Sequence, residues 1–283
     1  MKHTHRADFQ GGESLPEKRW VGPSFSRAAS GYDRVAALQR QVGEQLLAGL
    51  LESPFMPGII LDVGAGTGYC TARLAEQFPE AGLFALDIAE GMLRKLHGRP
   101  GLRGKVLRVC GDGESLPLRD GSVDLVFSNL ALQWCVDLPA ALAEFRRVLR
   151  PAGVMLFSTF GDGTLCELHE AWAKTDGYSH VNAFVPLASV DSALAGLGVA
   201  MFEAGSERRV ITYPDVDALL KELKGLGARN LTRNRPRHLT GKGVFRKMLA
   251  AYPKSTPEGR IEASFEIIQC RVVLAGLEIC SGS

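Results

Sequence analysis

Five short apolar runs recur along the middle of the chain, each separated from the next by polar or helix-patterned sequence. They occupy residues 59–63, 83–87, 105–110, 123–128 and 154–159. The stretches between them include predicted helices at 71–78, 90–96 and 140–149. Strands that alternate with helices predict an α/β fold with a parallel sheet. Because such crossovers are right-handed, we expect a doubly wound sheet with helices on both faces.

The flanks of this core add further elements. A docking helix is predicted at 33–51, because apolar residues recur there at helical spacing. The later predicted elements are helices near 165–174, 190–197, 216–226 and 244–252 and strands at 208–213 and 260–275. The two added strands give a mostly parallel seven-stranded sheet with a small helical cap insertion. The predicted parts are an N-terminal segment with the docking helix (1–51), an α/β domain (52–213 plus 258–283) and a basic helical cap (214–257).

The composition is that of an ordinary globular chain, with 46% hydrophobic and 23% charged residues among 283. No apolar run approaches the roughly 20 residues that cross a bilayer, and no apolar signal segment follows the polar start. We therefore expect a cytoplasmic protein. The six cysteines form no C-x-x-C pair, so neither a disulfide framework nor a metal site is expected.

The sharpest local signal is a glycine-rich stretch at the end of the first predicted strand. Residues 61–68 read Leu-Asp-Val-Gly-Ala-Gly-Thr-Gly, with Asp62 two positions before the first glycine. Glycines here let a ligand approach the backbone closely. A dinucleotide fingerprint would read G-x-G-x-x-G and offer a helix N-terminus to a pyrophosphate. The carboxylate of Asp62 suits a cationic ligand better, although an isolated G-x-G-x-G also serves as a tight turn.

Two further acids follow the next two predicted strands. Asp87 ends the second strand, where it can accept hydrogen bonds from both hydroxyls of a ribose. Asp112 follows the third strand, where it can accept from an adenine amino group while the next backbone residues meet the ring edge. Either acid alone also fits a loop or a helix cap. Together the three acids line the carboxyl ends of neighbouring strands, where open α/β sheets bind ligands.

This combination resembles the class I S-adenosylmethionine-dependent methyltransferases over roughly residues 59–159. S-adenosylmethionine, the cofactor that the resemblance implies, carries an ammonium and a sulfonium and has no phosphate. The resemblance also implies a Rossmann-like sheet. The cofactor-binding residues that it implies are Asp62, Gly64, Ala65, Gly66, Gly68, Asp87, Ile88, Asp112, Gly113 and Asn129.

The flanking segments resemble one branch more closely, the malonyl-acyl-carrier-protein O-methyltransferases of biotin synthesis. The matching segments are FSRAASGYD at 25–33, ALQ at 37–39, SNLALQW at 128–134, FSTFG at 157–161, TL at 164–165, HVNAF at 180–184, GARN at 227–230 and LTGK at 239–242. This similarity extends from about residue 25 to residue 273. One departure is Phe265, where that family usually carries a Tyr.

The resemblance implies a reaction in which the free carboxylate of a malonyl thioester, held on acyl carrier protein, attacks the sulfonium methyl and becomes a methyl ester. Such a carboxylate is ionised at neutral pH, so the reaction needs no general base and depends on positioning. We therefore expect no nucleophile–His–Asp arrangement. The site should instead provide donors for the carboxylate and a roof that excludes water.

Several residues are candidates for these roles. The candidate catalytic residues are Tyr32, Asn129, Trp134, His180 and Asn182. Phe25 and Tyr32 could form the roof, and Arg27 could pair with the substrate carboxylate. Asn129, Gln133 and Trp134 follow the fourth predicted strand, beside the expected position of the methyl group. The aromatic residues could equally be packing residues, and His180 could be a satisfied core or surface group.

The net charge of +2 conceals a basic segment. Residues 221–247 carry nine basic residues and one acid, a charge of +8, which leaves −6 for the rest of the chain. Acyl carrier proteins are acidic, so malonyl-acyl carrier protein is the implied partner and would be steered to this segment. The expected partner-binding residues are Arg229, Arg233, Arg235, Arg237 and Lys242. The same charge also fits a solvated helix face or a general polyanion site.

Three other functions stay open at the level of sequence. A small-molecule methyltransferase, acting on a free acid or a quinone precursor, would not need the basic cap. A nucleic-acid-binding protein could use the basic segment, although that segment has almost no aromatic residues to stack on bases, which argues against nucleic acid as a partner. The third is a cofactor sensor without catalytic activity.

Overall fold

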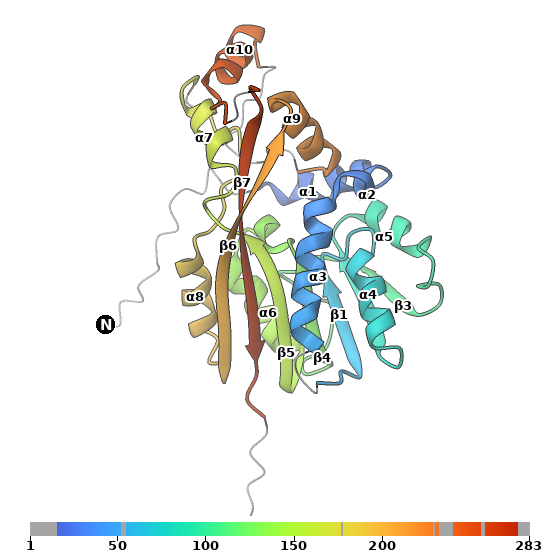
Figure 1. Ribbon diagram of the computed structural model, residues 1–283. Coiled ribbons are helices and arrows are strands. Elements are labelled where there is room, and N and C mark those ends of the chain that lie inside the picture. The colour runs from blue at the N-terminus through green and yellow to red at the C-terminus, as the bar shows by residue number, and fades with distance from the viewer. Residues whose placement is uncertain are drawn as a thin grey trace, which may run out of the picture.

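One seven-stranded sheet organises the molecule (Figure 1). The computed structural model describes residues 16–51, 55–176, 178–228, 230–231, 240–255 and 258–276. The strands are β1 (Ile59–Val63), β2 (Gly82–Asp87), β3 (Val106–Cys110), β4 (Val123–Asn129), β5 (Leu149–Phe160), β6 (Met201–Tyr213) and β7 (Ile261–Val273). Their order is β3-β2-β1-β4-β5-β7-β6, and β7 alone runs in the direction opposite to the other six strands. The predicted mostly parallel, doubly wound sheet is therefore confirmed.

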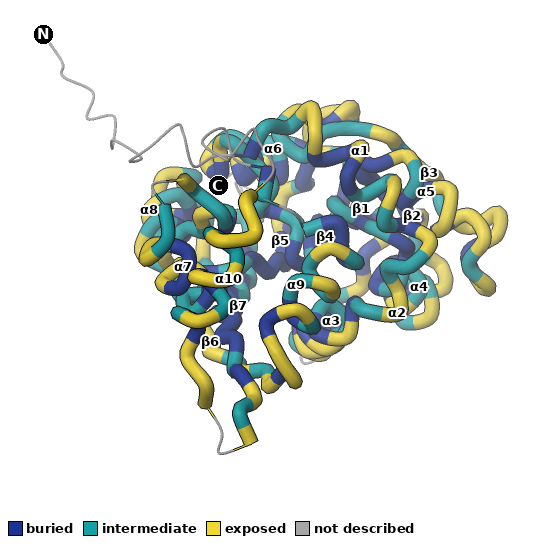
Figure 2. The backbone as a smooth tube through the Cα atoms, turned by 90° about the horizontal axis from the view of Figure 1, so that it is seen from above, coloured by how far each residue is buried: buried dark blue, intermediate teal, exposed yellow. Residues whose placement is uncertain are grey.

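Helices cover both faces of this sheet. The described helices are α1 (Lys18–Ala28), α2 (Tyr32–Val35), α3 (Ala37–Leu51), α4 (Tyr69–Gln77), α5 (Glu90–His97), the 3₁₀ turn η1 (Leu132–Trp134), α6 (Leu138–Val148), α7 (Cys166–Ala173), α8 (Leu187–Ala195), α9 (Val216–Gly225) and α10 (Lys242–Ala251). Alternate residues of β1 separate the two faces. Ile60 packs with α3 and α4, while Leu61 and Val63 pack with α6 and α8. Both faces of the central strands are thus buried, which explains their continuous apolar runs (Figure 2).

The two last strands extend beyond the others. β5 pairs with β7 only as far as Phe160 and Ile267, whereas β6 pairs with β7 to the first residue of β7. Residues 208–213 and 261–266 therefore form a two-stranded ribbon above the carboxyl ends of the parallel strands. Helices α7, α9 and α10 pack around this ribbon in one apolar cluster (Figure 1). The result is a helical roof over the ligand-binding edge of the sheet.

This roof bears on the predicted division of the chain. Helices α9 and α10 come from the 214–257 segment, while α7 precedes it and contacts both α10 and β7. The division at 214 and 257 stays a prediction, and the layer above the sheet is built from more than that segment. Among the described residues, no helix has both the length and the apolar character that a membrane span requires.

Two elements differ from the sequence-based expectation. Helix α1 was not predicted, because its apolar stripe is short (Val21, Phe25 and Ala28) and Pro23 lies in its interior. It is held by close packing instead: a Cβ on Gly22 would stand 2.8 Å from the carbonyl oxygen of Ile88. Strand β6 begins at Met201 and not at Arg208. Its first half was missed because it lies at the sheet edge, where most positions are exposed and the residues form no apolar run.

Candidate active site

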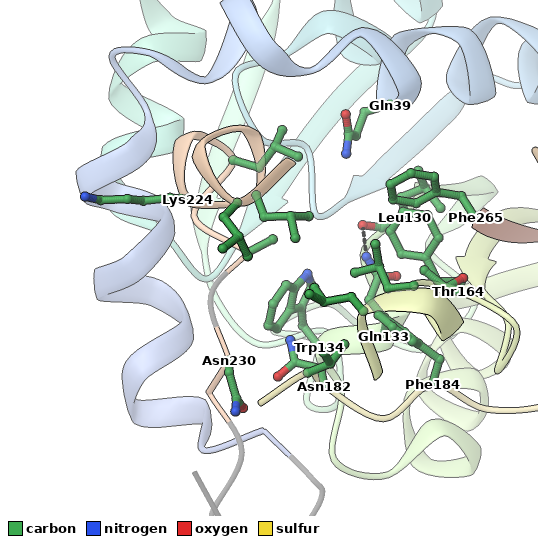
Figure 3. Close-up of a pocket in the computed structure, with 18 of the residues that line it drawn as sticks. Gln39, Leu130, Gln133, Trp134, Thr164, Asn182, Phe184, Lys224, Asn230 and Phe265 are labelled. Atoms are coloured by element: carbon green, nitrogen blue, oxygen red, sulfur yellow. Dashed lines mark hydrogen bonds between the residues drawn. The ribbon is translucent and has the colours of Figure 1, made fainter. Parts of the chain in front are cut away.

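Three adjoining cavities lie where the parallel strands end. The first, here called the loop pocket, measures about 100 Å³ and lies against the glycine-rich loop and the ends of β2 and β3. The second, the cap cavity, measures about 440 Å³ and lies between the sheet edge and helices α7 and α9 (Figure 3). The third, the inner pocket, measures about 40 Å³ and lies between α3 and the same loop. Tyr32 lines all three, so its phenol stands at their junction.

The glycine-rich loop takes a conformation that side chains disfavour. Gly64 and Gly66 have φ angles of +73° and +56°. A Cβ on Gly64 would stand 2.3 Å from the Cβ of Ala131, whereas one on Gly66 would meet nothing nearer than 4.0 Å. Gly64 is thus required by packing, and Gly66 leaves open space beside the pockets. Of the predicted loop residues, Gly68 lines none of the three cavities and directly precedes α4 as its N-cap, in a left-handed conformation.

Two buried carboxyl groups lie beside this loop, and neither forms an ion pair with a basic side chain of the described residues. Asp87 is 8% exposed and accepts hydrogen bonds from the backbone N–H groups of Gly66 (2.8 Å) and Ala89 (2.7 Å). Burial still raises its pKa to about 6. Asp62 is 2% exposed and accepts from the hydroxyl of Thr71 at 2.6 Å, and burial raises its pKa to about 7. Because no basic side chain of the described residues pairs with either, a cationic ligand fits this site.

The third predicted acid is already paired. Asp112 lines the loop pocket, and one of its carboxylate oxygens accepts a hydrogen bond from Lys18 Nζ at 2.5 Å. Lys18 also pairs with Glu114. This lysine comes from α1, which the sequence analysis missed. The predicted residues Ile88 and Gly113 line the loop pocket, and Ala65 lines the inner pocket.

An aromatic roof covers the loop pocket. Phe25 of α1 meets Trp134 edge to face, with ring centroids 5.1 Å apart, and both rings line the loop pocket and the cap cavity. Tyr32 is half-buried, and desolvation with the nearby charge of Asp87 raises the pKa of its hydroxyl, which therefore stays protonated. The structure thus brings the three predicted aromatic residues together. Arg27 is exposed and lines none of the three cavities.

Asn129 and Gln133 are held by hydrogen bonds within the protein. Asn129 lines the loop and inner pockets, accepts from the hydroxyl of Ser158 at 2.8 Å and donates to the backbone carbonyl of Gln39 at 2.8 Å. Gln133 donates to the carbonyl of Leu130 at 2.6 Å (Figure 3). Asn129 therefore joins β4, β5 and α3, and its predicted catalytic role stays a proposal.

His180 and Asn182 line the cap cavity, as the sequence analysis requires of substrate-facing residues. The His180 ring stacks on Trp172 at 3.7 Å and its Nε2 lies 2.8 Å from a carboxylate oxygen of Asp176. Asn182 accepts from the backbone N–H of Leu231 at 3.1 Å. These contacts join the segment after α7 to the residues after α9, so both side chains help to close the cavity.

The predicted partner residues lie mostly outside the described part of the chain. Arg229, Arg233, Arg235 and Arg237 fall there, whereas Lys242 begins α10 and is exposed. Sequence reasoning also assigned no role to Gln39 and Arg40, which line the inner pocket from α3. The sequence contains one sign that α3 packs closely against its neighbours, the glycine at position 43 in the interior of the helix. A Cβ on Gly43 would stand 2.5 Å from Cys70 Sγ.

Comparisons with known proteins agree with this geometry. A family model described as a methyltransferase domain matches residues 61–157. The malonyl-[acyl-carrier protein] O-methyltransferase of Methylococcus capsulatus is 51% identical over 274 residues, which cover 96% of this chain and 99% of that protein. The YcgJ protein of Bacillus subtilis has a TM-score of 0.60 at 16% identity, covering 82% of this chain and 98% of that chain. The cyclase SpnF has a TM-score of 0.57 at 17% identity, covering 93% of this chain and 98% of that chain. These two likenesses show the fold alone, and a cyclase among them means that the fold does not fix the chemistry.

Proposed function

Because the chain belongs to the malonyl-acyl-carrier-protein O-methyltransferases, which are S-adenosylmethionine-dependent enzymes, we propose that it methylates the free carboxyl of malonyl-acyl carrier protein, a step of biotin synthesis. One observation carries the proposal: the loop pocket, which contains the buried carboxyl of Asp87 without a cationic partner, shares a wall with the larger, mostly apolar cap cavity. The shared wall contains Phe25, Tyr32 and Trp134. A cationic cofactor and an acyl arm could therefore meet there without water between them. The cytoplasmic location stays a prediction.

The reaction requires little of the protein beyond the correct placement of the substrate carboxylate and the cofactor methyl. S-adenosylmethionine supplies an electrophilic methyl on a sulfonium. A carboxylate oxygen of the substrate forms the new C–O bond as the S–C bond breaks, the electron pair of that bond stays on sulfur, and no proton moves. Phe25 and Trp134 exclude water from this point, which strengthens the attraction between the carboxylate and the cation. Catalysis then rests on the in-line approach of the oxygen.

The cofactor-binding residues follow from the geometry of the two small pockets. Asp87 would accept from the ribose hydroxyls, since two backbone N–H groups fix its orientation and leave lone pairs free. Asp62 would face the ammonium group through the inner pocket. Asp112 would meet the adenine from the loop pocket, with Lys18 holding one oxygen. Gly64 and Gly66 keep the loop backbone open to the ligand.

We expect cofactor affinity to fall in acid. The raised pKa values of Asp62 and Asp87 mean that folding without ligand favours the protonated carboxyls. That contribution to stability is present below about pH 4 and is lost as pH rises through 6 to 7. A cation binds the ionised forms instead, so the Kd should increase on the order of 10- to 100-fold between pH 8 and pH 5.5. Isothermal titration calorimetry would measure it, together with proton release near pH 6.

The control for this pH dependence is 5′-methylthioadenosine. It keeps the adenosine but lacks the ammonium and the sulfonium, so its affinity should depend less on pH. An equal dependence for both ligands would contradict a cation site at Asp62.

The cap offers a surface for the acidic carrier. Five exposed basic residues of α9 and α10 form no ion pair within the described residues. They are Lys221, Lys224, Lys242, Arg246 and Lys247. Opposite charge across an encounter surface raises the association rate. We therefore propose that malonyl-acyl carrier protein docks on this face.

Charge reversal tests the docking face. We expect the triple variant Lys221→Glu, Lys242→Glu and Arg246→Glu to lower kcat/KM for the carrier substrate on the order of 10- to 100-fold at low salt. The loss should shrink at high salt, because salt screens exposed charges. A matched control carries Arg103→Glu, Lys105→Glu and Arg108→Glu, exposed residues in and beside β3 at the opposite sheet edge. Equal losses in both triple variants would remove the docking role from the cap.

Mass spectrometry of the carrier protein tests the proposed function itself. The protein is incubated with S-adenosylmethionine and malonyl-acyl carrier protein, and the carrier should gain the mass of one methylene. Unloaded carrier and free malonate serve as controls. Equally efficient methylation of free malonate would support the small-molecule alternative, and no mass gain would overturn the proposal.

A further inference from the structure

The indole of Trp134 carries a hydrogen-bond donor that the proposed reaction has not yet used. Trp134 stands in the wall that the loop pocket shares with the cap cavity, and four residues line both cavities: Phe25, Tyr32, Leu130 and Trp134. Only Tyr32 and Trp134 among them have a polar side-chain group. The attacking oxygen must meet the cofactor methyl where these two cavities join, so a group that orients this oxygen belongs to the shared wall.

The indole N–H is free to bind a ligand. Within the described part of the chain, Trp134 donates only through its backbone N–H, to the carbonyl of Ala131 at 3.0 Å. Its Nε1 keeps accessible surface. Figure 3 shows this nitrogen on the side of the ring that faces the other lining residues. Because an indole N–H can only donate, it suits a ligand that can only accept, such as a carboxylate.

The other polar group of the shared wall, the hydroxyl of Tyr32, lies on the cofactor side. Tyr32 also lines the inner pocket, and after burial the charge of Asp87 is the next cause that raises the pKa of its hydroxyl. Trp134 does not line the inner pocket. Of the two donors, Trp134 is therefore the one that belongs to the substrate side.

The Trp134 ring is firmly placed. Phe25 meets it edge to face, with ring centroids 5.1 Å apart and the ring planes at 81°. The turn that carries it is anchored by Leu132, which is buried in the same apolar cluster as α6. Ala131, just before the turn, lies so close to Gly64 that a Cβ on that glycine would not fit. The turn thus rests on the glycine-rich loop, and its indole can orient a ligand with little loss of entropy.

The remaining polar side chains of the cap cavity do not offer a donor at this wall. Five already bond to protein groups: Gln133, Thr164, His180, Asn182 and Asn230. The other two, Gln39 and Lys224, do not line the loop pocket. The described lining of the cap cavity contains no arginine. A carboxylate that enters this mostly apolar cavity must nevertheless be hydrogen-bonded.

We propose that the indole N–H of Trp134 donates a hydrogen bond to the malonyl carboxylate and holds it where the loop pocket meets the cap cavity. This inference rests on the proposed function. A neutral donor leaves the negative charge with the carboxylate, whereas an ion pair would reduce its reactivity toward the sulfonium. The hydrogen bond is also stronger to a charged acceptor than to an ester carbonyl, so the product is held less tightly than the substrate.

Replacing the indole N–H by sulfur tests this role with little change in the shape of the side chain and none in its charge. Benzothienylalanine at position 134 keeps the two fused rings and removes the donor. We expect kcat/KM for malonyl-acyl carrier protein to fall about 10- to 100-fold at saturating cofactor, and at least as far in Trp134→Phe. The matched control carries benzothienylalanine at position 20, because Trp20 is exposed on α1 and lines neither cavity. Its kcat/KM should be unchanged.

Two binding measurements separate the donor from a packing role. Isovaleryl-acyl carrier protein has an isopropyl group in place of the carboxylate, so its Ki should change less than about threefold when benzothienylalanine replaces Trp134. The Kd of S-adenosylmethionine is measured in the same protein, because Trp134 also lines the loop pocket. It should likewise change less than about threefold, since the replacement adds no charge and keeps the wall of that pocket.

Each outcome decides the inference. An equal loss of turnover and of isovaleryl-carrier binding would show a packing role and overturn it. A parallel loss of cofactor affinity would assign the N–H to the cofactor and also overturn it. Unchanged kcat/KM in the benzothienylalanine protein overturns this inference alone, whereas wild-type protein that never methylates the carrier overturns the proposed function and this inference with it.

Discussion

Replacing Asp87 by alanine is expected to weaken S-adenosylmethionine binding by about 2–4 kcal/mol, which is a factor of roughly 30 to 1,000 in Kd. The carboxylate is buried at the end of β2 and is oriented by the N–H groups of Gly66 and Ala89. Removing it takes away two charge-assisted acceptors for the ribose and also releases the loop at Gly66. Calorimetric titration with the cofactor measures the effect directly.

The control for Asp87→Ala is an acid that lies outside the cavities. Asp120 is exposed and pairs with Arg147 at 2.7 Å, so Asp120→Ala should leave the Kd unchanged. Circular dichroism and the unfolding midpoint of the ligand-free variants would show that both fold. Unaltered affinity in folded Asp87→Ala contradicts the assigned ribose contact.

The predictable part of the fold is the part in which sequence pattern and burial coincide. Strand β4 reads Val-Asp-Leu-Val-Phe-Ser-Asn and is buried over most of its length, so its apolar run alone identifies it. Helix α1 could not be found in this way, since Gly22 and Ser24 pack closely without being apolar. The beginning of β6 was hidden for a related reason. Exposed positions of an edge strand can hold charged residues such as Glu203 and Glu207 without burying a charge. Residues 201–207 therefore lack the apolar pattern by which a strand is recognised.

The residues of the candidate site also fall into those that the sequence pattern could place and those that it could not. Asp62, Asp87 and Asp112 could be placed because parallel strands deliver their carboxyl ends to one edge, whatever the details of packing. Lys18 and Gln39 could not, because they reach the site from helices whose docking depends on tertiary contacts. Local sequence gave no sign that Lys18 would meet Asp112, 94 residues away. Gly43 was the one local sign that α3 approaches the sheet closely.

Two neighbouring glycines should respond differently to the same substitution, because only one of them is confined by packing. In Gly64→Ala the new Cβ would meet Ala131 at 2.3 Å and the φ of +73° disfavours any side chain. We expect the free energy of unfolding to fall by about 2–5 kcal/mol. In Gly66→Ala only the φ of +56° is penalised, which costs about 1–2 kcal/mol.

For cofactor affinity, in contrast to stability, the substitution at Gly66 should have the larger effect. The Cβ of Gly66→Ala would stand in open space beside the loop and inner pockets, where the cofactor would lie, so we expect at least a tenfold increase in Kd from a protein that still folds. Denaturant unfolding and calorimetric titration of both variants give the two quantities, with Gly101→Ala as the control for a positive φ far from the loop, since its φ is +85° with no neighbour within 4 Å. If Gly66→Ala binds the cofactor as tightly as Gly101→Ala does, the methyl donor does not pass over this loop.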